Sequence, residues 1–199
     1  MLKIMIAVPT FENIEPETFG SIYDLNVPDN VVTDFRYTRG YDCARARNAI
    51  VKAGINEEFD YILMIDSDII VPKETLQFAL ENEPDIILGV YPRKNDPDKS
   101  EIFNNGYDDF KPSARWSIQE LKNFPSNRIR IKGGGFGCAL VKTSVYKDIG
   151  YPYFNYVNYD DGTFLSEDLY LCTQATKHNY PIYVDTRILC KHIRRDIVG

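Results

Sequence analysis

The chain lacks the features that would place it in a membrane or an export pathway. Its 199 residues contain no apolar run close to the roughly 20 residues that span a bilayer. The apolar N-terminus is too short for a signal peptide, and the acidic residues after Pro9-Thr10 resemble no cleavage site. We therefore predict a cytoplasmic protein with no transmembrane segment, which would meet any lipid-linked partner at the periphery of a membrane.

Positive charge is also scarce. Lys and Arg number 23 against 29 Asp and Glu, which gives a formal net charge of −6. A protein that binds nucleic acid needs an excess of cations to neutralise the phosphates, so this composition argues against nucleic acid as a partner. A small phosphate-bearing molecule stays compatible with it, because a bound metal ion supplies positive charge locally.

Cysteine is sparse and scattered, with four residues and no CxxC pair: Cys43, Cys138, Cys172 and Cys190. This spacing indicates neither a zinc knuckle nor a redox motif. We interpret the four thiols as small buried apolar groups in a reducing compartment.

What the chain has in its first half is an alternation of strands and helices. Residues 4–8, 61–65 and 86–90 are short, almost wholly apolar runs, typical of parallel strands covered on both faces. Residues 31–37 mix polar and apolar side chains and predict a strand near a sheet edge. Helices are expected over 44–55 and 73–82. Such α/β sheets bind ligands beyond the carboxyl ends of their strands.

The second half is less regular. Residues 91–130 are rich in Asn, Asp, Lys, Pro and Ser, which indicates either disorder or a functional lid. Arg93 and Lys94 enter this segment and are interpreted as solvated charges, with phosphate contact as the alternative. The glycine run 133–137 predicts close backbone approach to a substrate, or a bend. A helix is expected over 165–178, followed by short strands at 182–185 and 188–192.

Asp66-Ser67-Asp68 directly follows the apolar run Tyr61–Ile65. On an extended backbone the two aspartates point to the same side, and like charges beside a dry core are costly without a cation. Carboxylate oxygens favour Mg²⁺ or Mn²⁺, which keep open positions for phosphates. The alternative is a solvated turn in which the aspartates bond to their own loop. The buried strand before them favours the metal site.

Several motifs occur in one order along the chain: Ala46-Arg47-Asn48, the run 59–72, the segment 133–140, Leu165-Ser166-Glu167-Asp168, and His192. In this order they resemble GT-A glycosyltransferases, particularly family 2-like members of the nucleotide-diphospho-sugar transferase superfamily. The resemblance implies an α/β fold with a single GT-A domain over 1–199, a Rossmann-like mixed sheet flanked by helices. Residues 1–90 would form the nucleotide-binding half and 91–199 the acceptor-binding and catalytic half.

The resemblance also implies a site for Mn²⁺ or Mg²⁺ held by Asp66, Asp68 and His192. Within it, Asp66 and Ser67 would lie on the nucleotide side, and Asp68 would be the principal ligand. Taken alone, a histidine such as His192 is more often a packed or surface residue than a metal ligand, and it is the resemblance that favours the ligand.

Further nucleotide contacts implied by the resemblance come from the loop after the first strand and from the next helix: Pro9, Thr10, Glu12, Arg47 and Asn48. The alternative for the first three is an ordinary loop. A guanidinium suits a diphosphate, but the sequence leaves open whether Arg45 or Arg47 makes that contact. The second strand lacks the Asp-Asp-Gly-Ser stretch that many family 2 members direct at the nucleotide, so the base is also left open.

Asp168 matches the acidic residue that serves inverting members of the family as general base, and Glu167 either positions it or is the base itself. The alternative is two acids placed favourably at a helix N-terminus.

The predicted function is that of a hexosyltransferase-like, metal-dependent enzyme. It moves a sugar from a nucleotide-diphospho-sugar donor to a glycan, lipid-linked or protein acceptor, with inversion. One alternative is a sugar-phosphate nucleotidyltransferase, which would need a glycine-rich basic loop that residues 9–13 do not provide. The other is a non-catalytic nucleotide- or glycan-binding module of the same fold.

Overall fold

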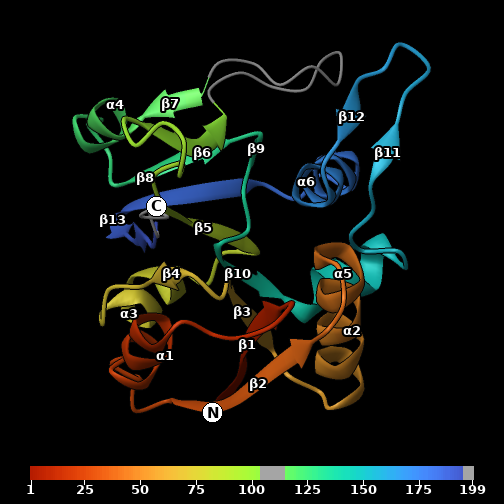
Figure 1. Ribbon diagram of the computed structural model, residues 1–199. Helices are drawn as coiled ribbons and strands as arrows, with labels where there is room; N and C mark the ends of the chain where they lie inside the picture. Colours follow the sequence, from red (N-terminus) through yellow and green to blue (C-terminus); the bar gives the residue numbers. More distant parts are fainter. Residues whose placement is uncertain (104–114, 195–199) are drawn as a thin grey trace.

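A seven-stranded sheet runs through the computed structural model, which describes residues 1–103 and 115–194 (Figure 1). In spatial order its strands are β2 (Val31–Arg39), β1 (Leu2–Thr10), β3 (Tyr61–Ile65), β10 (Cys138–Lys142), β5 (Ile86–Val90), β13 (Ile182–Leu189) and β8 (Arg128–Ile131). The sheet is mixed, because β10 runs antiparallel between β3 and β5 while β1 is parallel to both β2 and β3. The predicted mixed α/β sheet is therefore confirmed.

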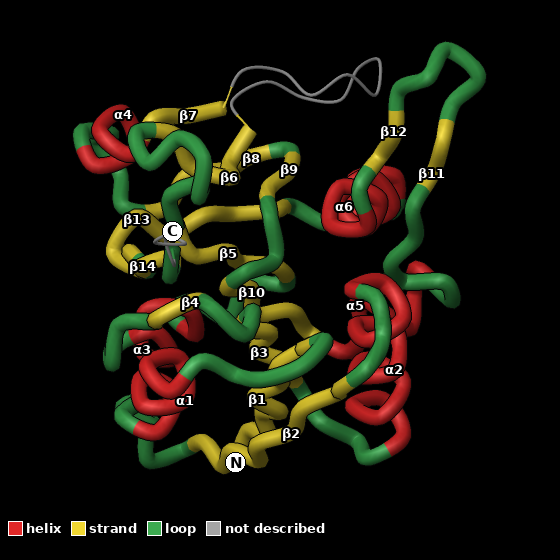
Figure 2. Tube along the Cα trace, viewed as in Figure 1, coloured by secondary structure: helices red, strands yellow, loops and turns green. Residues whose placement is uncertain are grey.

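Helices cover both faces of this sheet, as Figure 2 shows. On one side lie α1 (Pro16–Tyr23) and α3 (Thr75–Leu80), and on the other α2 (Cys43–Asn56), α5 (Thr143–Ile149) and α6 (Glu167–Lys177). The short helix α4 (Ile118–Lys122) packs near the far edge. None of the helices in the described part of the chain has the length and apolar character to cross a bilayer.

The strands expected at 4–8, 61–65 and 86–90 are confirmed, and the strand expected over 31–37 is the edge strand β2. Two boundaries differ from the expectation. The helix expected over 73–82 spans only Thr75–Leu80, because Asn82 and Glu83 adopt positive φ angles that end it. The two expected strands near the C-terminus are largely one, β13, since pairing with β5 carries the chain through a bulge after Asp185.

Three smaller sheets complete the arrangement. Within the expected irregular segment 91–130, β6 (Lys99–Phe103) and β7 (Arg115–Ser117) pair with each other, and β6 also pairs with β9 (Gly133–Gly134). Residues 104–114 of that segment lie outside the described residues. The hairpin of β11 (Val157–Asn158) and β12 (Phe164–Leu165) projects beside α6 (Figure 1). In the third, β4 (Ile69–Ile70) pairs with β14 (Lys191–His192).

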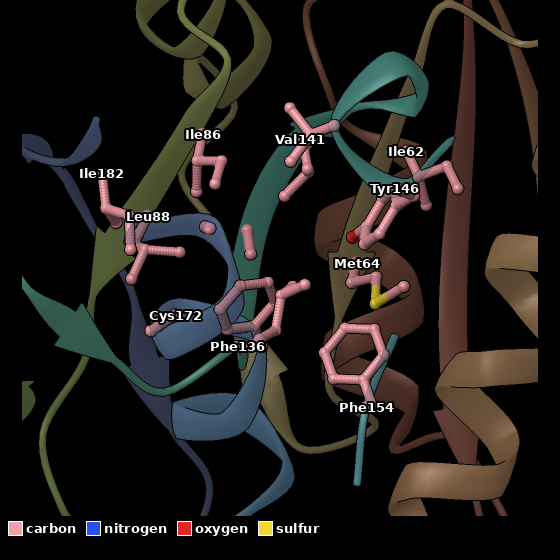
Figure 3. Packing of buried hydrophobic residues seen from close by; sticks show 14 of the residues in the cluster. Ile62, Met64, Ile86, Leu88, Phe136, Val141, Tyr146, Phe154, Cys172 and Ile182 are labelled. Atoms are coloured by element: carbon pink, nitrogen blue, oxygen red, sulfur yellow. The ribbon is translucent and has the colours of Figure 1, made fainter. Parts of the chain in front are cut away.

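Apolar side chains fill the space on both faces of the sheet. Along β3, Ile62 and Met64 belong to the cluster beneath α2 and α6, whereas Leu63 and Ile65 belong to the cluster beneath α1 and α3. Figure 3 shows the first cluster, in which Phe136 and Phe154 lie close to Met64. Because each fully buried side chain of this kind contributes about 1.5–3 kcal/mol, this double core fixes the strand ends that carry the site.

The prediction that the cysteines are buried thiols is confirmed for three of the four. None of the four forms a disulfide, and Cys138, Cys172 and Cys190 are buried. Cys43 is only partly buried, because it begins helix α2 at the edge of the sheet.

Candidate functional site

A cleft of about 250 Å³ lies beyond the carboxyl ends of β1 and β3. This is the edge at which sheets of this type bind ligands. Five of the predicted site residues line it: Pro9, Thr10, Asp66, Ser67 and Asp68. Glu12 is exposed on the same loop but is not part of the lining. Its expected nucleotide contact stays a prediction.

Arg47 forms the centre of a charge cluster beneath the cleft. Asp42 caps the N-terminus of helix α2, because its side chain accepts a hydrogen bond from the Arg45 backbone N–H, and the buried face of the helix carries Arg47. The Arg47 side chain is 1% exposed. Its guanidinium donates to Asp66 Oδ1 at 2.8 Å, to Glu167 Oε1 at 2.8 Å, and to Asp168 Oδ1.

These contacts join parts of the chain that lie far apart in sequence, since Arg47 and Glu167 are separated by 120 positions. Burial works against the charged guanidinium, but Asp168 and Asp66 outweigh it and raise the pKa of Arg47 well above its usual value. Removing one partner of such a buried ion pair typically costs about 3–5 kcal/mol. Arg47 therefore holds the Asp66 and Glu167-Asp168 motifs in one place.

The geometry does not favour the direct diphosphate contact expected for Arg47, because its two terminal nitrogens are already bonded to carboxylates below the surface. Of the two arginines left open by the sequence, Arg45 is the exposed one, with its guanidinium 5.3 Å from the Tyr41 ring centre.

Asp168 is held at both carboxylate oxygens. Oδ1 meets Arg47, and Oδ2 accepts the backbone N–H of Phe136 at 3.2 Å. Burial raises the pKa of Asp168 to about 7 although Arg47 opposes it, and the neighbouring charges of Glu167 and Asp66 act in the same direction as burial. A carboxyl group with a pKa near neutrality is well matched to accepting a proton at physiological pH.

Asp68 lies in a second, more open centre. The β4–β14 pairing sets His192 opposite Ile69, next in sequence to Asp68. His192 Nε2 is 3.5 Å from Asp68 Oδ1, and its Nδ1 donates to the Pro92 carbonyl oxygen at 2.8 Å. The Lys94 ammonium pairs with Asp68 Oδ2. The charge expected at Lys94 is therefore not merely solvated.

The pKa values of Asp68 and His192 are set by a balance between burial and the groups that bond to them. Burial works to raise the pKa of Asp68, but His192 and Lys94 outweigh it and lower that pKa to about 2. Burial likewise works to lower the pKa of His192, but its bonds to Asp68 and Pro92 raise it overall. Asp68 is thus a fully ionised carboxylate that already attracts a cation.

Within residues 1–103 and 115–194, no three His, Cys, Asp or Glu side chains converge closely enough to hold a metal alone. Asp68 and His192 form a pair, and Asp66 Oδ1 is taken by Arg47. Magnesium is commonly held by one or two carboxylates together with substrate phosphates. The Asp68 carboxylate already attracts one cation, the Lys94 ammonium. Asp68 and His192 therefore fit a metal ion that is shared with a diphosphate.

Asn48 has partners other than those expected. Its Nδ2 donates to the Phe154 carbonyl oxygen at 2.7 Å, and its Oδ1 accepts from the backbone N–H groups of Tyr153 and Phe154 at 3.0 and 3.2 Å. The amide therefore fastens the turn before Phe154 onto α2. The geometry does not favour the nucleotide contact expected for Asn48.

The glycine run is explained by Tyr91. The Tyr91 hydroxyl accepts the Gly137 N–H at 3.1 Å, and a Cβ atom at Gly137 would lie 2.7 Å from the Tyr91 ring. A Cβ atom at Gly135 would lie 2.1 Å from the same hydroxyl. These glycines make room for a buried tyrosine, which differs from both the substrate approach and the flexible bend expected from the sequence.

Sequence reasoning missed several residues around the cleft. Phe11, Tyr41, Asp42 and Cys43, together with Ala46, complete its lining. Their only signal was position, directly after the first strand or at the start of the helix that carries Arg47. Such residues are hard to single out because loop aromatics and helix caps are common.

No protein-family model and no curated protein sequence matches the chain, whereas solved structures do. A197 from STIV superposes with a TM-score of 0.64 at 14% identity, over 98% of this chain and 87% of that chain. GalNAc-T7, solved with UDP, GalNAc and Mn²⁺, gives 0.62 at 10% identity over 98% of this chain. The fold is GT-A-like.

A third neighbour with this fold is S. aureus TarS, with a TM-score of 0.58 at 18% identity over 97% of this chain. The chain spans only 44% of the GalNAc-T7 chain and 37% of the TarS chain. At these identities the likeness establishes the GT-A-like fold alone, which is the fold that the resemblance of the motifs implies.

Proposed function

We propose that the chain is a metal-dependent glycosyltransferase that moves a sugar from a nucleotide-diphospho-sugar to an acceptor hydroxyl on a glycan, lipid or protein. One observation carries this proposal. A single buried guanidinium, that of Arg47, joins Asp66 at the cleft to Glu167 and Asp168 from the other half of the chain. Arg47 thereby holds the carboxylate of Asp168, which can accept a proton, next to the cleft to which we assign the sugar donor.

The donor binds in the cleft formed by residues 1–90. Pro9, Thr10 and Ser67 line the nucleotide side. Phe11 and Tyr41 are 69% and 45% exposed at the same cleft, and their rings offer faces on which a base can stack. The identity of the nucleobase is determined by the donor panel described below.

Asp68 and His192 would hold the divalent cation together with the donor diphosphate. When bound, Mn²⁺ or Mg²⁺ supplies positive charge against the departing nucleoside diphosphate. The Lys94 ammonium, which now pairs with Asp68, would be displaced by such an ion, and its flexible stem would let it turn toward the phosphates.

Asp168 acts as the general base, and it comes from the catalytic half of the chain, residues 91–199. Arg47 and the Phe136 N–H orient the two oxygens of the carboxylate. The acceptor oxygen forms a bond to the anomeric carbon while the bond from that carbon to the diphosphate oxygen breaks. The hydroxyl proton passes to Asp168, and the configuration at the carbon inverts. Glu167 positions Arg47 and, through it, Asp168.

A panel of nucleotide-diphospho-sugars tests the proposal. With Mn²⁺ present, at least one donor should release nucleoside diphosphate slowly without any acceptor, and chelation should stop the release. Metal-dependent binding without any turnover would contradict the enzymatic assignment and favour a non-catalytic binding module. Formation of a sugar nucleotide from a sugar phosphate and a nucleoside triphosphate would favour a nucleotidyltransferase instead.

A further inference from the structure

A second hollow, about 550 Å³ in volume, lies along the outer side of α2. One wall is the exposed face of that helix, with Arg45 and Lys52, and the other is the turn that carries Tyr151 and Tyr153. Tyr41 lines both this groove and the donor cleft, so the two share a wall. We call this hollow the α2 groove.

The α2 groove is cationic in an acidic protein. Arg45 and Lys52 are two helical turns apart and both exposed, which places them on the same side of α2. Its lining contains no Asp or Glu among the residues that the structure describes. Within that same part of the chain neither side chain has a carboxylate partner, and Arg45 instead lies over the Tyr41 ring at 5.3 Å. Two cations are thus free to meet an anionic ligand.

The opposite wall offers aromatic faces held in place. Tyr151 is 77% exposed, and its ring centre lies 5.9 Å from that of Tyr153 at a right angle. The three hydrogen bonds from the Asn48 amide fasten this turn to α2, and Tyr153 also packs on Tyr146 at 5.7 Å. Because the wall is fixed before any ligand arrives, binding there loses little conformational entropy.

We propose that the α2 groove binds an acidic segment of the acceptor, an oligosaccharide that bears phosphate or carboxylate groups. Tyrosine rings pack against sugar faces, and Arg45 and Lys52 pair with the anionic groups. Tyr41 lines both hollows, so the groove lies next to the donor cleft, where an acceptor held in it is close to the transfer site. This assignment of the acceptor class rests on the proposed glycosyl transfer.

Titration calorimetry on the whole chain tests the assignment with three probes: mannopentaose phosphate, unphosphorylated mannopentaose and trigalacturonic acid. At least one acidic probe should bind about tenfold more tightly than the neutral one, a difference of about 1.4 kcal/mol. The probe that binds distinguishes phosphate from carboxylate. Equal binding of all three probes, or binding of neither acidic probe, would overturn the assignment.

A matched pair of double variants locates the binding. Arg45→Ala/Lys52→Ala should weaken the acidic probe about tenfold or more, since two charge-assisted contacts are lost. Arg130→Ala/Lys177→Ala removes one arginine and one lysine from exposed positions on β8 and α6 and should bind like wild type. Tyr151→Ala should weaken the acidic and neutral probes alike. If the two double variants bound the acidic probe with equal affinity, the assignment of binding to the α2 groove would be wrong.

The donor panel separates this proposal from the one on which it rests. Donor hydrolysis together with groove variants that bind like wild type would remove only the acceptor assignment. Groove binding without any donor hydrolysis would remove the transferase function and leave the groove as a binding site for acidic oligosaccharides.

Discussion

Asp66 and Asp68 are two residues apart, yet their carboxylates are neutralised in opposite ways. Asp66 meets Arg47, whose side chain is 1% exposed and shared with two further acids. Asp68 meets Lys94, whose side chain is 44% exposed, and the ring of His192. A buried guanidinium bonded on several sides cannot leave, whereas an ammonium on a flexible exposed stem can.

This difference suggests a division of labour between a fixed centre and an exchangeable one. The fixed centre, Arg47 with its three carboxylates, positions the acids to which we assign the chemistry. The exchangeable centre is Asp68 with Lys94 and His192, and under the proposed function a metal ion would replace the Lys94 ammonium there. The following predictions test this difference between the two centres.

The largest effect is expected from Arg47→Met, which leaves three carboxylates without their cation. The free energy of unfolding should fall by about 3–5 kcal/mol, measured by urea denaturation. The control is Arg45→Met on the exposed side of the same helix, which should change stability by less than about 0.5 kcal/mol. Equal stabilities of the two variants would contradict a fixed centre.

Asp168→Asn should lower the rate of sugar transfer by about 10²–10⁴-fold, because an amide cannot accept the acceptor proton. In wild type the rate should rise with pH through about 7 and then level off, since the carboxyl group of pKa about 7 is ionised only above that range. Steady-state kinetics across pH measure both effects. An Asp168→Asn variant with wild-type rate and the same pH profile would remove Asp168 from the role of base.

Gly137→Ala tests whether the glycine run makes room for Tyr91. The added methyl group would lie 2.7 Å from the buried Tyr91 ring, so overpacking should cost about 1–3 kcal/mol of stability. The double variant Gly137→Ala/Tyr91→Phe retains the ring and should recover little. Thermal unfolding measures both variants, and an unchanged melting temperature in Gly137→Ala would refute the packing role.

The smallest effect is expected from Lys94→Met. Removing the ammonium that competes for Asp68 should tighten Mn²⁺ binding several-fold in the absence of nucleotide, as measured by electron paramagnetic resonance of free Mn²⁺. Lys122→Met, on exposed α4, removes the same charge elsewhere and should leave Mn²⁺ affinity unchanged. Weaker Mn²⁺ binding in Lys94→Met would contradict the exchange.

Much of this arrangement follows from the sequence. The apolar run Tyr61–Ile65 predicted β3, and the position of Asp66 and Asp68 at its end follows from that strand alone. The fold class followed from the alternation of strands and helices. These features depend on local periodicity, which the sequence displays directly.

The features that the sequence did not reveal depend on contacts between distant residues. Nothing near Arg47 shows that two of its partners lie 120 and 121 positions away, or that Asn48 bonds to the turn before Phe154. Lys94 looked like a solvated charge because its pairing with Asp68 requires β3 and β5 to end at the same edge of the sheet, on either side of β10. The continuous strand β13 likewise arises from pairing with β5 rather than from its own alternation.

The most direct test of the exchangeable centre is the melting temperature with Mn²⁺ and the nucleoside diphosphate of the best donor, in wild type and in Asp68→Asn. Ligand at 100 times its Kd stabilises the folded state by about 2.7 kcal/mol, so wild type should melt at a higher temperature when both are present. The account predicts that Asp68→Asn loses this rise, while Asp34→Asn, on the edge strand β2, keeps it. A metal-dependent rise of wild-type size in Asp68→Asn would contradict the account.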